Sequence, residues 1–282
     1  MLVLRRVGLA VVVALAAACS ISTQPTPGRG EAEPVGDVEP AQPGQPTDPA
    51  TGDVDEETKP EPEVPETETP PGDILGTLSG SCGIVKTLLT TGTPTFEKNA
   101  LAFVAGETYE AASLSTEGHR IMTTPNAGGS SVESEVMSFE VLRACEGAKL
   151  LKTETEVKYL ENTTGPSTDI LVEIGGKRVG VSVTRAYRPK NQTFPDADVK
   201  SLIQKKLEDV NKSSARVKPE DEWVKQILHV FASNQAQADA VARVLPTIDA
   251  AIRANTIVLL TQTSGGGFVY CNPDPPLGSE CP

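Results

Sequence analysis

Acidic residues and one lysine are the side chains of this sequence that could do chemistry together. Glu135 lies in the first turn of a predicted helix, and Asp169 opens a predicted strand. Lys152, Glu154 and Glu156 alternate along another predicted strand, so their side chains share one of its faces. Carboxylates that come together can bind Mg²⁺, and a lysine beside them can orient or activate a water molecule.

Each of these residues also has a purely structural interpretation. Asp169 can cap the strand that it opens, and Glu135 can be a first-turn acid favoured by the helix dipole. Lys152, Glu154 and Glu156 can form a solvated strand face with weak cross-strand ion pairs. Both interpretations remain open at this stage for every member of the set.

Other kinds of site have little support in the sequence. No Cys-x-x-Cys pair occurs and the two histidines, His119 and His229, are isolated, so we expect no zinc site. We interpret His229, which lies inside an apolar run, as a core histidine. The glycines at 265–267 lack the Lys-Ser/Thr of a phosphate loop, and there is no Gly-x-Ser-x-Gly motif. We therefore expect no metal and no cofactor, with Mg²⁺ at Glu135 and Asp169 as the alternative.

The first nineteen residues predict export. Arg5 and Arg6 precede an apolar run that ends in Ala16-Ala-Ala18, directly before Cys19. The run is too short for the roughly 20 apolar residues of a membrane span. The segment 1–18 resembles a bacterial lipoprotein signal, which implies cleavage before Cys19 and a lipid on its sulfur. The alternative is an ordinary cleaved signal followed by a chance cysteine.

Residues 19–72 predict a disordered tether. Residues 20–72 hold twelve Pro, thirteen acidic residues, two basic residues and no aromatic residue, a composition that cannot bury enough apolar surface to fold. Of the net charge of −13, this segment carries −11 and the signal +2, so residues 73–282 carry only about −4. We therefore expect no nucleic-acid partner, because such a partner is normally held by a broad basic patch. Ser20, in place of Asp, resembles the sorting pattern of outer-membrane lipoproteins.

Four cysteines remain after Cys19, an even number that suggests disulfides in an exported protein. Three pairings are possible. Cys271 and Cys281 bracket a turn-rich tail that a disulfide would pin. We favour that pair, which leaves Cys82 to pair with Cys145.

The remaining pattern predicts an α/β fold with a mixed central sheet flanked by helices. Residues 73–129 read as a small N-terminal region of short strands and loops, and residues 130–282 as the main domain. In the main domain a strand pair, 169–174 and 177–186, flanks the hairpin turn Gly175-Gly176. The other expected helices are 132–146, 196–211 and 235–254, and the other expected strands are 148–159, 226–232, 256–262 and 267–270.

The order α-β-β-β-α-β over residues 130–232 resembles the core of the PD-(D/E)xK nucleases. The resemblance implies a metal site in which Asp169 supplies the second-strand carboxylate and Glu135 the helix carboxylate. Ser182 and Thr184 stand where Glu-x-Lys is expected on the third strand, and two hydroxyls replace neither the carboxylate nor the amine. Glu173, Lys205 and Lys206 could in principle substitute, although Glu173 lies four strand residues from Asp169, roughly 13 Å away.

Residues 126–270 also resemble an uncharacterised family that occurs in bacterial lipoproteins and in lower eukaryotes. The matching segments are 126–131 (Asn-Ala-Gly-Gly-Ser-Ser), 138–142 (Ser-Phe-Glu-Val-Leu), 151–154 (Leu-Lys-Thr-Glu), 180–185 (Gly-Val-Ser-Val-Thr-Arg) and 225–229 (Lys-Gln-Ile-Leu-His). The resemblance implies no activity. It does suggest that Ser-Val-Thr is this family's own form of the third-strand motif.

These observations predict a lipoprotein anchored in the cell envelope, in the outer membrane if the cell has one. The membrane, through the lipid on Cys19, and an unidentified surface protein are the expected partners. We expect the nuclease-like domain to be a non-catalytic binding module. The alternative is a metal-dependent phosphodiesterase with a migrated site at Glu135, Asp169, Glu154 and Lys152.

Overall fold

The structure is a computed structural model that describes residues 76–104, 113–127, 132–189 and 192–270. The chain divides into two units, Met1–Glu63 and Val64–Pro282, and all described residues belong to the second. The expected signal, Cys19, the tether and the pair Cys271 and Cys281 therefore lie outside the described residues. Within the described ranges, no helix combines the length and the apolar character that crossing a membrane requires.

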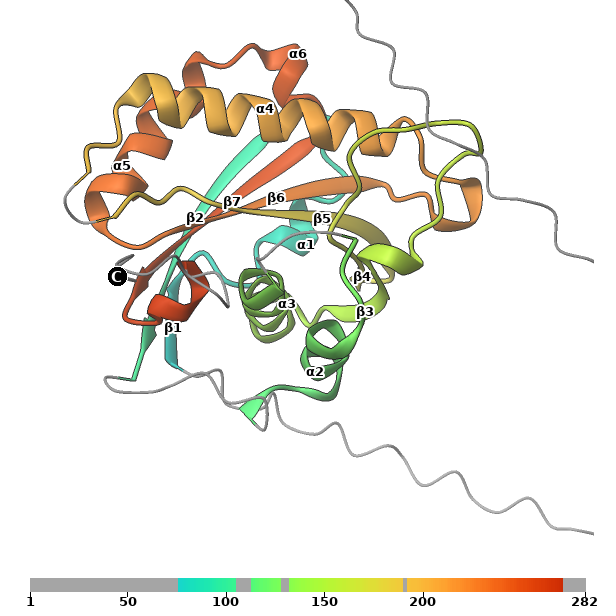
Figure 1. Ribbon diagram of the computed structural model, residues 1–282, viewed down its shortest axis with the longest axis horizontal. Helices are drawn as coiled ribbons and strands as arrows, with labels where there is room; N and C mark the ends of the chain where they lie inside the picture. Colours follow the sequence, from blue (N-terminus) through green and yellow to red (C-terminus); the bar gives the residue numbers. More distant parts are fainter. Residues whose placement is uncertain (1–75, 105–112, 128–131, 190–191, 271–282) are drawn as a thin grey trace, which may run out of the picture. The chain divides into compact units, whose positions relative to one another are not determined.

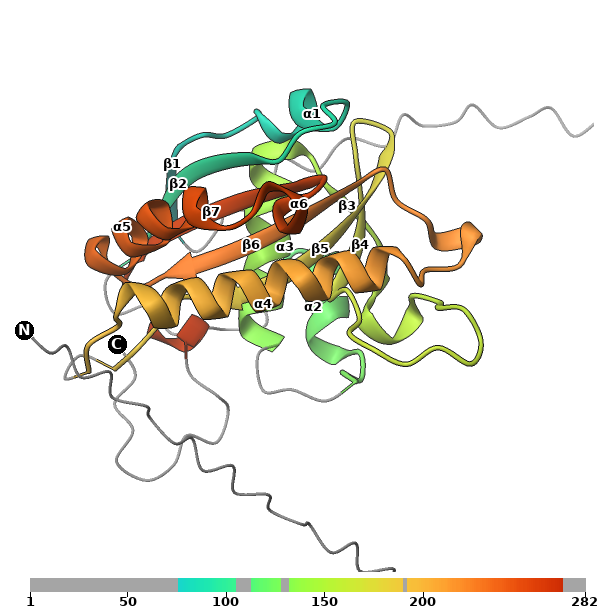
Figure 2. The ribbon, with the colours of Figure 1, turned by 90° about the horizontal axis from the view of Figure 1, so that it is seen from above.

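A single seven-stranded mixed sheet forms the centre of the described unit, in the order β1-β2-β7-β6-β5-β4-β3 (Figures 1 and 2). The four strands β2, β7, β6 and β5 run parallel, whereas β1, β4 and β3 are each antiparallel to their neighbours. The strands are β1 Gly76–Gly80, β2 Thr95–Phe103, β3 Lys149–Thr153, β4 Ile170–Ile174, β5 Lys177–Arg185, β6 Lys225–Ala232 and β7 Thr256–Ser264.

Helices cover both faces of the sheet, which confirms the predicted α/β class (Figure 1). Apolar side chains of α1, α2 and α3 pack in one core layer, and those of α4 and α5 in the other. All eight residues of β6 are buried, as expected of a parallel strand that is covered on both faces. The helices are α1 Val85–Leu88, α2 Thr116–Thr123, α3 Val132–Glu146, α4 Asp196–Ser214, α5 Gln235–Val244 and α6 Ala250–Arg253.

The predicted element order is present from α3 to β6. The β4–β5 hairpin turns at Gly175 and Gly176, whose φ angles of 56° and 72° suit glycine and a tight hairpin turn. The region 73–129, expected as a small N-terminal addition, supplies β1 and β2 to the same sheet. Its helix α2 packs against α3.

Three expected elements differ from the structure. The strand expected over 148–159 ends at Thr153, and residues 154–156 form a 3₁₀ turn (η2) that the Glu156 carboxylate closes by accepting the Thr153 N–H at 2.9 Å. The helix expected over 235–254 stops at Val244, because Pro246 cannot continue it. The last expected strand, 267–270, is a 3₁₀ helix (η5), and the Tyr270 hydroxyl bonds back to Thr263 at 2.8 Å.

A disulfide joins Cys82 to Cys145, as predicted. It links the segment before α1 to the last turn of α3. Beside it, the Glu146 carboxylate accepts the backbone N–H groups of Gly83 at 2.8 Å and Lys86 at 3.2 Å. The C-terminal end of α3 is thereby fixed by one covalent and two hydrogen bonds.

Candidate functional site

Asp169 lies directly before β4, against the C-terminal half of β5. Its N–H donates to the Val181 carbonyl at 3.0 Å. Its carboxylate accepts the Val183 N–H at 2.6 Å. Asp169 therefore does cap the hairpin, and the same contacts hold its carboxylate at one end of the β4–β5 pair.

Glu135 reaches the same place from the other side, because it stands in the first turn of α3. Its side chain is only 5% exposed. The Asn126 amide, which precedes the helix, donates to the two Glu135 carboxylate oxygens at 3.3 and 3.4 Å. A first-turn acid suits the helix dipole, so the structural interpretation of Glu135 also holds.

Glu154, in η2, completes an acidic cavity. Its carboxylate accepts the Ala127 N–H at 3.0 Å. Glu135, Glu154 and Asp169 all line one cavity of about 10 Å³, roughly the space of one water molecule. The other lining residues are Ile121, Thr124, Pro125, Asn126 and Thr153. Acidic residues from three separate segments of the chain therefore line one cavity, which we call the acidic cavity.

The acidic cavity changes the protonation of Asp169. Two effects, burial first and the charge of the nearby Glu135 carboxylate second, raise the pKa of the Asp169 carboxyl to about 7. The Val183 N–H and the charge of Lys206 oppose this rise, while Glu154 adds to it. At neutral pH, Asp169 is therefore divided between its protonated and ionised forms.

Lys206 is the cation whose charge acts on Asp169. It lies on α4, one residue before Leu207, which is fully buried in the α4 layer. The sequence places Lys206 in the apolar stripe of its helix, and this position beside core residues is the signal that could have singled it out.

Lys152 does not join the acidic cavity. Its ammonium group pairs with Asp221 at 2.6 Å, on a carboxylate that is 3% exposed. Glu156 pairs with Arg120, also at 2.6 Å. The prediction that Lys152, Glu154 and Glu156 share one strand face is wrong. Strand β3 ends at Thr153, and the 3₁₀ turn that follows separates these side chains.

Ser182 and Thr184, the degenerate motif positions, are buried at 6% and 7% exposure. The Ser182 hydroxyl lies 3.4 Å from that of Thr168. Ser182 and Thr184 lie on the same face of β5 as the neighbouring Ala186, which packs in the core layer of α4. Within the described residues there is no group of three or more His, Cys, Asp or Glu side chains spaced to hold a metal ion.

His229 has the core position expected of it. It is fully buried, with the Ser138 hydroxyl 2.8 Å from Nδ1 and the Thr261 hydroxyl 2.7 Å from Nε2. Burial lowers the pKa of its imidazole to about 3. His229 is therefore neutral throughout the physiological pH range.

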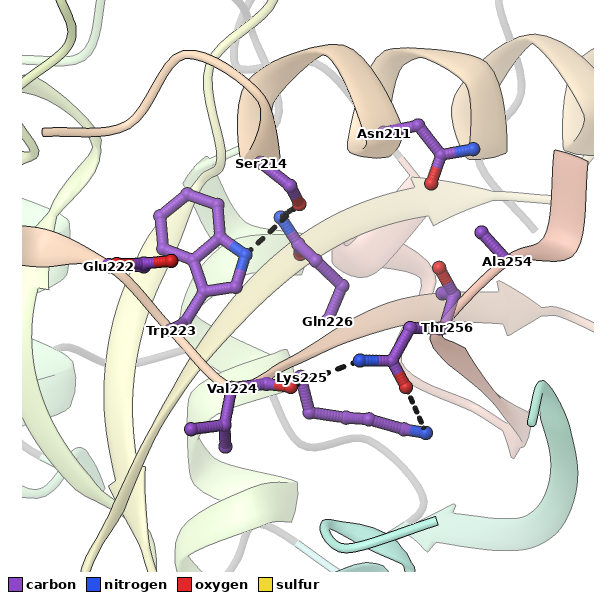
Figure 3. A pocket seen from close by; sticks show the side chains of 10 residues that line it. Asn211, Ser214, Glu222, Trp223, Val224, Lys225, Gln226, Ala254 and Thr256 are labelled. Atoms are coloured by element: carbon purple, nitrogen blue, oxygen red, sulfur yellow. Dashed lines mark hydrogen bonds between the residues drawn. The ribbon is translucent and has the colours of Figure 1, made fainter. Parts of the chain in front are cut away.

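A second cavity, of about 200 Å³, lies where the end of α4 meets the starts of β6 and β7 (Figure 3). The Trp223 indole N–H donates to the Ser214 hydroxyl at 3.1 Å. Lys225, 1% exposed, donates to the Thr91 carbonyl and the Asn255 side-chain oxygen, both at 2.6 Å. Because these polar groups bind one another, we interpret the cavity as a structural junction. The sequence has no pattern that predicts the buried role of Lys225.

Comparisons with known proteins give limited matches. No family model matches the chain. A protein of Dictyostelium discoideum described as "AAC-rich mRNA clone AAC4 protein" is 39% identical over 164 residues, which are 56% of this chain and 24% of that protein. The chain thus spans about a quarter of the length of this curated relative. Among solved structures, SfsA of Pyrococcus furiosus in complex with Ca²⁺ matches with a TM-score of 0.28 and 14% identity, over 51% of this chain and 70% of that chain.

Proposed function

We propose that residues 130–232 form a PD-(D/E)xK nuclease-like core and that the domain is a metal-dependent phosphodiesterase with a migrated site. One observation carries this proposal. Glu135 of α3, Glu154 of η2 and Asp169, directly before β4, line one cavity, and the charge of Lys206 on α4 opposes the rise in the pKa of Asp169. A buried acid with a raised pKa in a cavity lined by other acids is a feature of functional sites.

Mg²⁺ prefers oxygen ligands and is often held by only one or two carboxylates. Glu135 and Asp169 match this donor preference, whereas no three acids among the described residues are spaced to hold an ion and the cavity has the space of about one water molecule. Asp169 and Glu135 would hold the ion, and Glu154 would add charge beside it. A bound Mg²⁺ would polarise a phosphoryl oxygen and lower the pKa of a bound water. This chain has Thr184 at the lysine position of the Glu-x-Lys motif. Lys206, on α4, would supply the missing amine by orienting a water molecule near Asp169.

Calorimetric titration of the full chain with Mg²⁺ and Mn²⁺, followed by incubation with single- and double-stranded DNA, tests this proposal. We expect cation binding that Asp169→Ala and Glu135→Ala abolish. Lys206→Ala should keep cation binding but lose cleavage. Glu173→Ala is the matched control, because Glu173 lies on β4 and does not line the acidic cavity. Absence of cation binding in the wild type contradicts the proposal.

A non-catalytic binding module is the second candidate function. The observations that favour it are the hydroxyls of Ser182 and Thr184 and the small volume of the acidic cavity. In that role the acidic cavity holds protons, and the partner is a protein of the cell surface. The same titration separates the two functions. A domain that neither binds the cations nor cleaves DNA would be a binding module and not a phosphodiesterase.

We further propose that the chain is a lipoprotein of the cell envelope, with lipid on Cys19 and residues 19–72 as its tether. The support is the order of charged, apolar and small residues before Cys19. Labelled palmitate should enter the wild type in a bacterial host and fail to enter Cys19→Ser. Equal labelling of the two proteins contradicts lipid attachment at this position.

A further inference from the structure

A row of four polar side chains crosses the apolar layer between α3 and the sheet. Ser138 of α3, His229 of β6, Thr261 of β7 and Asn99 of β2 are connected in that order, at 2.8, 2.7 and 2.5 Å. All four are at most 5% exposed. Polar groups at this depth are costly unless they are hydrogen-bonded, so the row has a defined geometry.

The hydrogen bond between Thr261 and Asn99 determines which group donates in the other two hydrogen bonds of the row. The Thr261 hydroxyl donates to the Asn99 side-chain oxygen, so it must accept from His229 Nε2–H. A neutral imidazole has one donor and one acceptor nitrogen, which makes Nδ1 the acceptor. The Ser138 hydroxyl therefore donates to His229 Nδ1.

Ser138 lies three residues after Glu135, and residues at this spacing share one side of a helix. The two positions are about 4.5 Å apart along the helix axis. Apolar contacts around α3 are non-directional and tolerate small rotations. The Ser138–His229 hydrogen bond is directional and does not. A rotation of α3 that this bond prevents would carry the Glu135 carboxylate away from the acidic cavity.

The far end of α3 has a different fastening, through the Cys82–Cys145 disulfide and Glu146. These bonds hold the last turn of the helix, about two turns beyond Ser138. They tie α3 to the segment around α1 and leave its contact with β6 to the residues in the middle of the helix. Ser138 is therefore well placed to set how the first half of α3 lies on the sheet.

We infer that Ser138 and His229 are positioning residues that hold Glu135 beside Asp169 by fixing α3 against β6. The inference rests on the proposed function in that Glu135 and Asp169 are taken as the working pair. His229 does not touch a substrate or an ion in this role. Its neutral imidazole accepts a hydrogen bond from Ser138 of α3 and donates one to Thr261 of β7.

Ser138→Ala in the full chain tests the inference, with Ser213→Ala as the matched control. Ser213 is also fully buried, on the other face of the sheet, where its hydroxyl donates to the Val210 carbonyl of α4 at 2.9 Å and lies 3.3 Å from the Gln226 side-chain amide of β6. We expect amide hydrogen exchange in the first half of α3 to become about tenfold faster in Ser138→Ala, with other elements unchanged. Mn²⁺ affinity measured by calorimetry should fall about tenfold. Ser213→Ala should show neither effect, and Ser138→Thr, which keeps the hydroxyl, should restore both.

Two results would overturn the inference. One is exchange in α3 that stays at the wild-type rate in Ser138→Ala, or that rises equally in all elements. The other concerns the wild type alone, and it applies even if the variant does not fold: ¹⁵N chemical shifts of His229 that report no hydrogen bond at Nδ1. A wild type that binds no Mn²⁺ refutes the proposed function instead, and the exchange experiment still decides the positioning role.

Discussion

Burial and neighbouring acids alter the acidity of Asp169 strongly. A carboxyl group with a pKa of about 7 holds a proton over much of the range in which a cation would have to displace it. As the pH increases toward 7, Mn²⁺ affinity should therefore increase by up to about tenfold per pH unit, and above pH 7 it should level off. Calorimetry at pH 6, 7 and 8 measures this. An affinity that does not change over this range would show that Asp169 is not the ligand.

His229 predicts a pH dependence of stability. Its folded pKa of about 3 lies below its ordinary value of 6.5, so between these values the unfolded chain binds a proton that the folded protein does not. The stabilisation is complete above about pH 6.5 and is lost as the pH falls toward 3, by at most about 1.4 kcal/mol per pH unit. Urea unfolding from pH 7.5 to 4.5 should show this loss, and His229→Gln should show a smaller slope. Equal slopes in the two proteins would contradict the assignment.

At the scale of the elements, the disulfide ties two segments that are 63 residues apart in the chain. Replacing Cys82 and Cys145 by Ser should lower the free energy of unfolding by about 3–4 kcal/mol, because the unfolded chain regains the entropy of an open loop. Urea unfolding of the two proteins measures the difference. Reductant should produce a similar loss in the wild type, and a double variant as stable as the wild type would refute this prediction.

Gly180, in the middle of β5, leaves room for the ring of Trp223. A Cβ at this position would lie 2.9 Å from two Trp223 ring atoms and 3.1 Å from the Gln226 side chain. Gly180→Ala should therefore cost about 1–3 kcal/mol. Since Trp223 is the single tryptophan of the chain, its fluorescence should shift to the red. Gly92→Ala, where a Cβ meets nothing within 4 Å, should change neither quantity.

Elements with a strong local pattern could be predicted from the sequence, and those decided by distant contacts could not. The Gly175-Gly176 hairpin and the continuous apolar run of β6 are local signals, and both are present in the structure. The end of β3 depends on Glu156 reaching back to Thr153 across a turn, which no periodicity describes.

The candidate site shows the same division. Asp169 and Glu135 could be chosen because an α-β-β-β-α-β order gives them recognisable positions. Their shared cavity with Glu154, and the effect of Lys206, depend on how α3, η2 and α4 pack around β4. Lys152 was expected in this set, but the buried carboxylate of Asp221, 69 residues away in the chain, takes its ammonium group.

At the scale of the whole molecule, the N-terminal strands belong to the same core as the rest. Leu101 and Phe103 of β2 are buried in the layer beneath α3, and β2 forms the parallel neighbour of β7. A chain that lacks residues 1–104 should therefore fail to unfold cooperatively, whereas one that lacks only residues 1–72 should behave as the full chain. Circular dichroism during heating measures both. Cooperative unfolding of the shorter protein would refute this prediction.

The pairing of β2 with β7 also bears on how the protein is made. Asn99 and Thr261, which touch across these strands, are 162 residues apart. During synthesis β2 emerges well before its partner strand β7, because this separation must first be translated. Contacts this distant slow folding, and a strand left unpaired meanwhile is prone to aggregate. A nascent chain of this protein therefore depends on being kept soluble until β7 has been made.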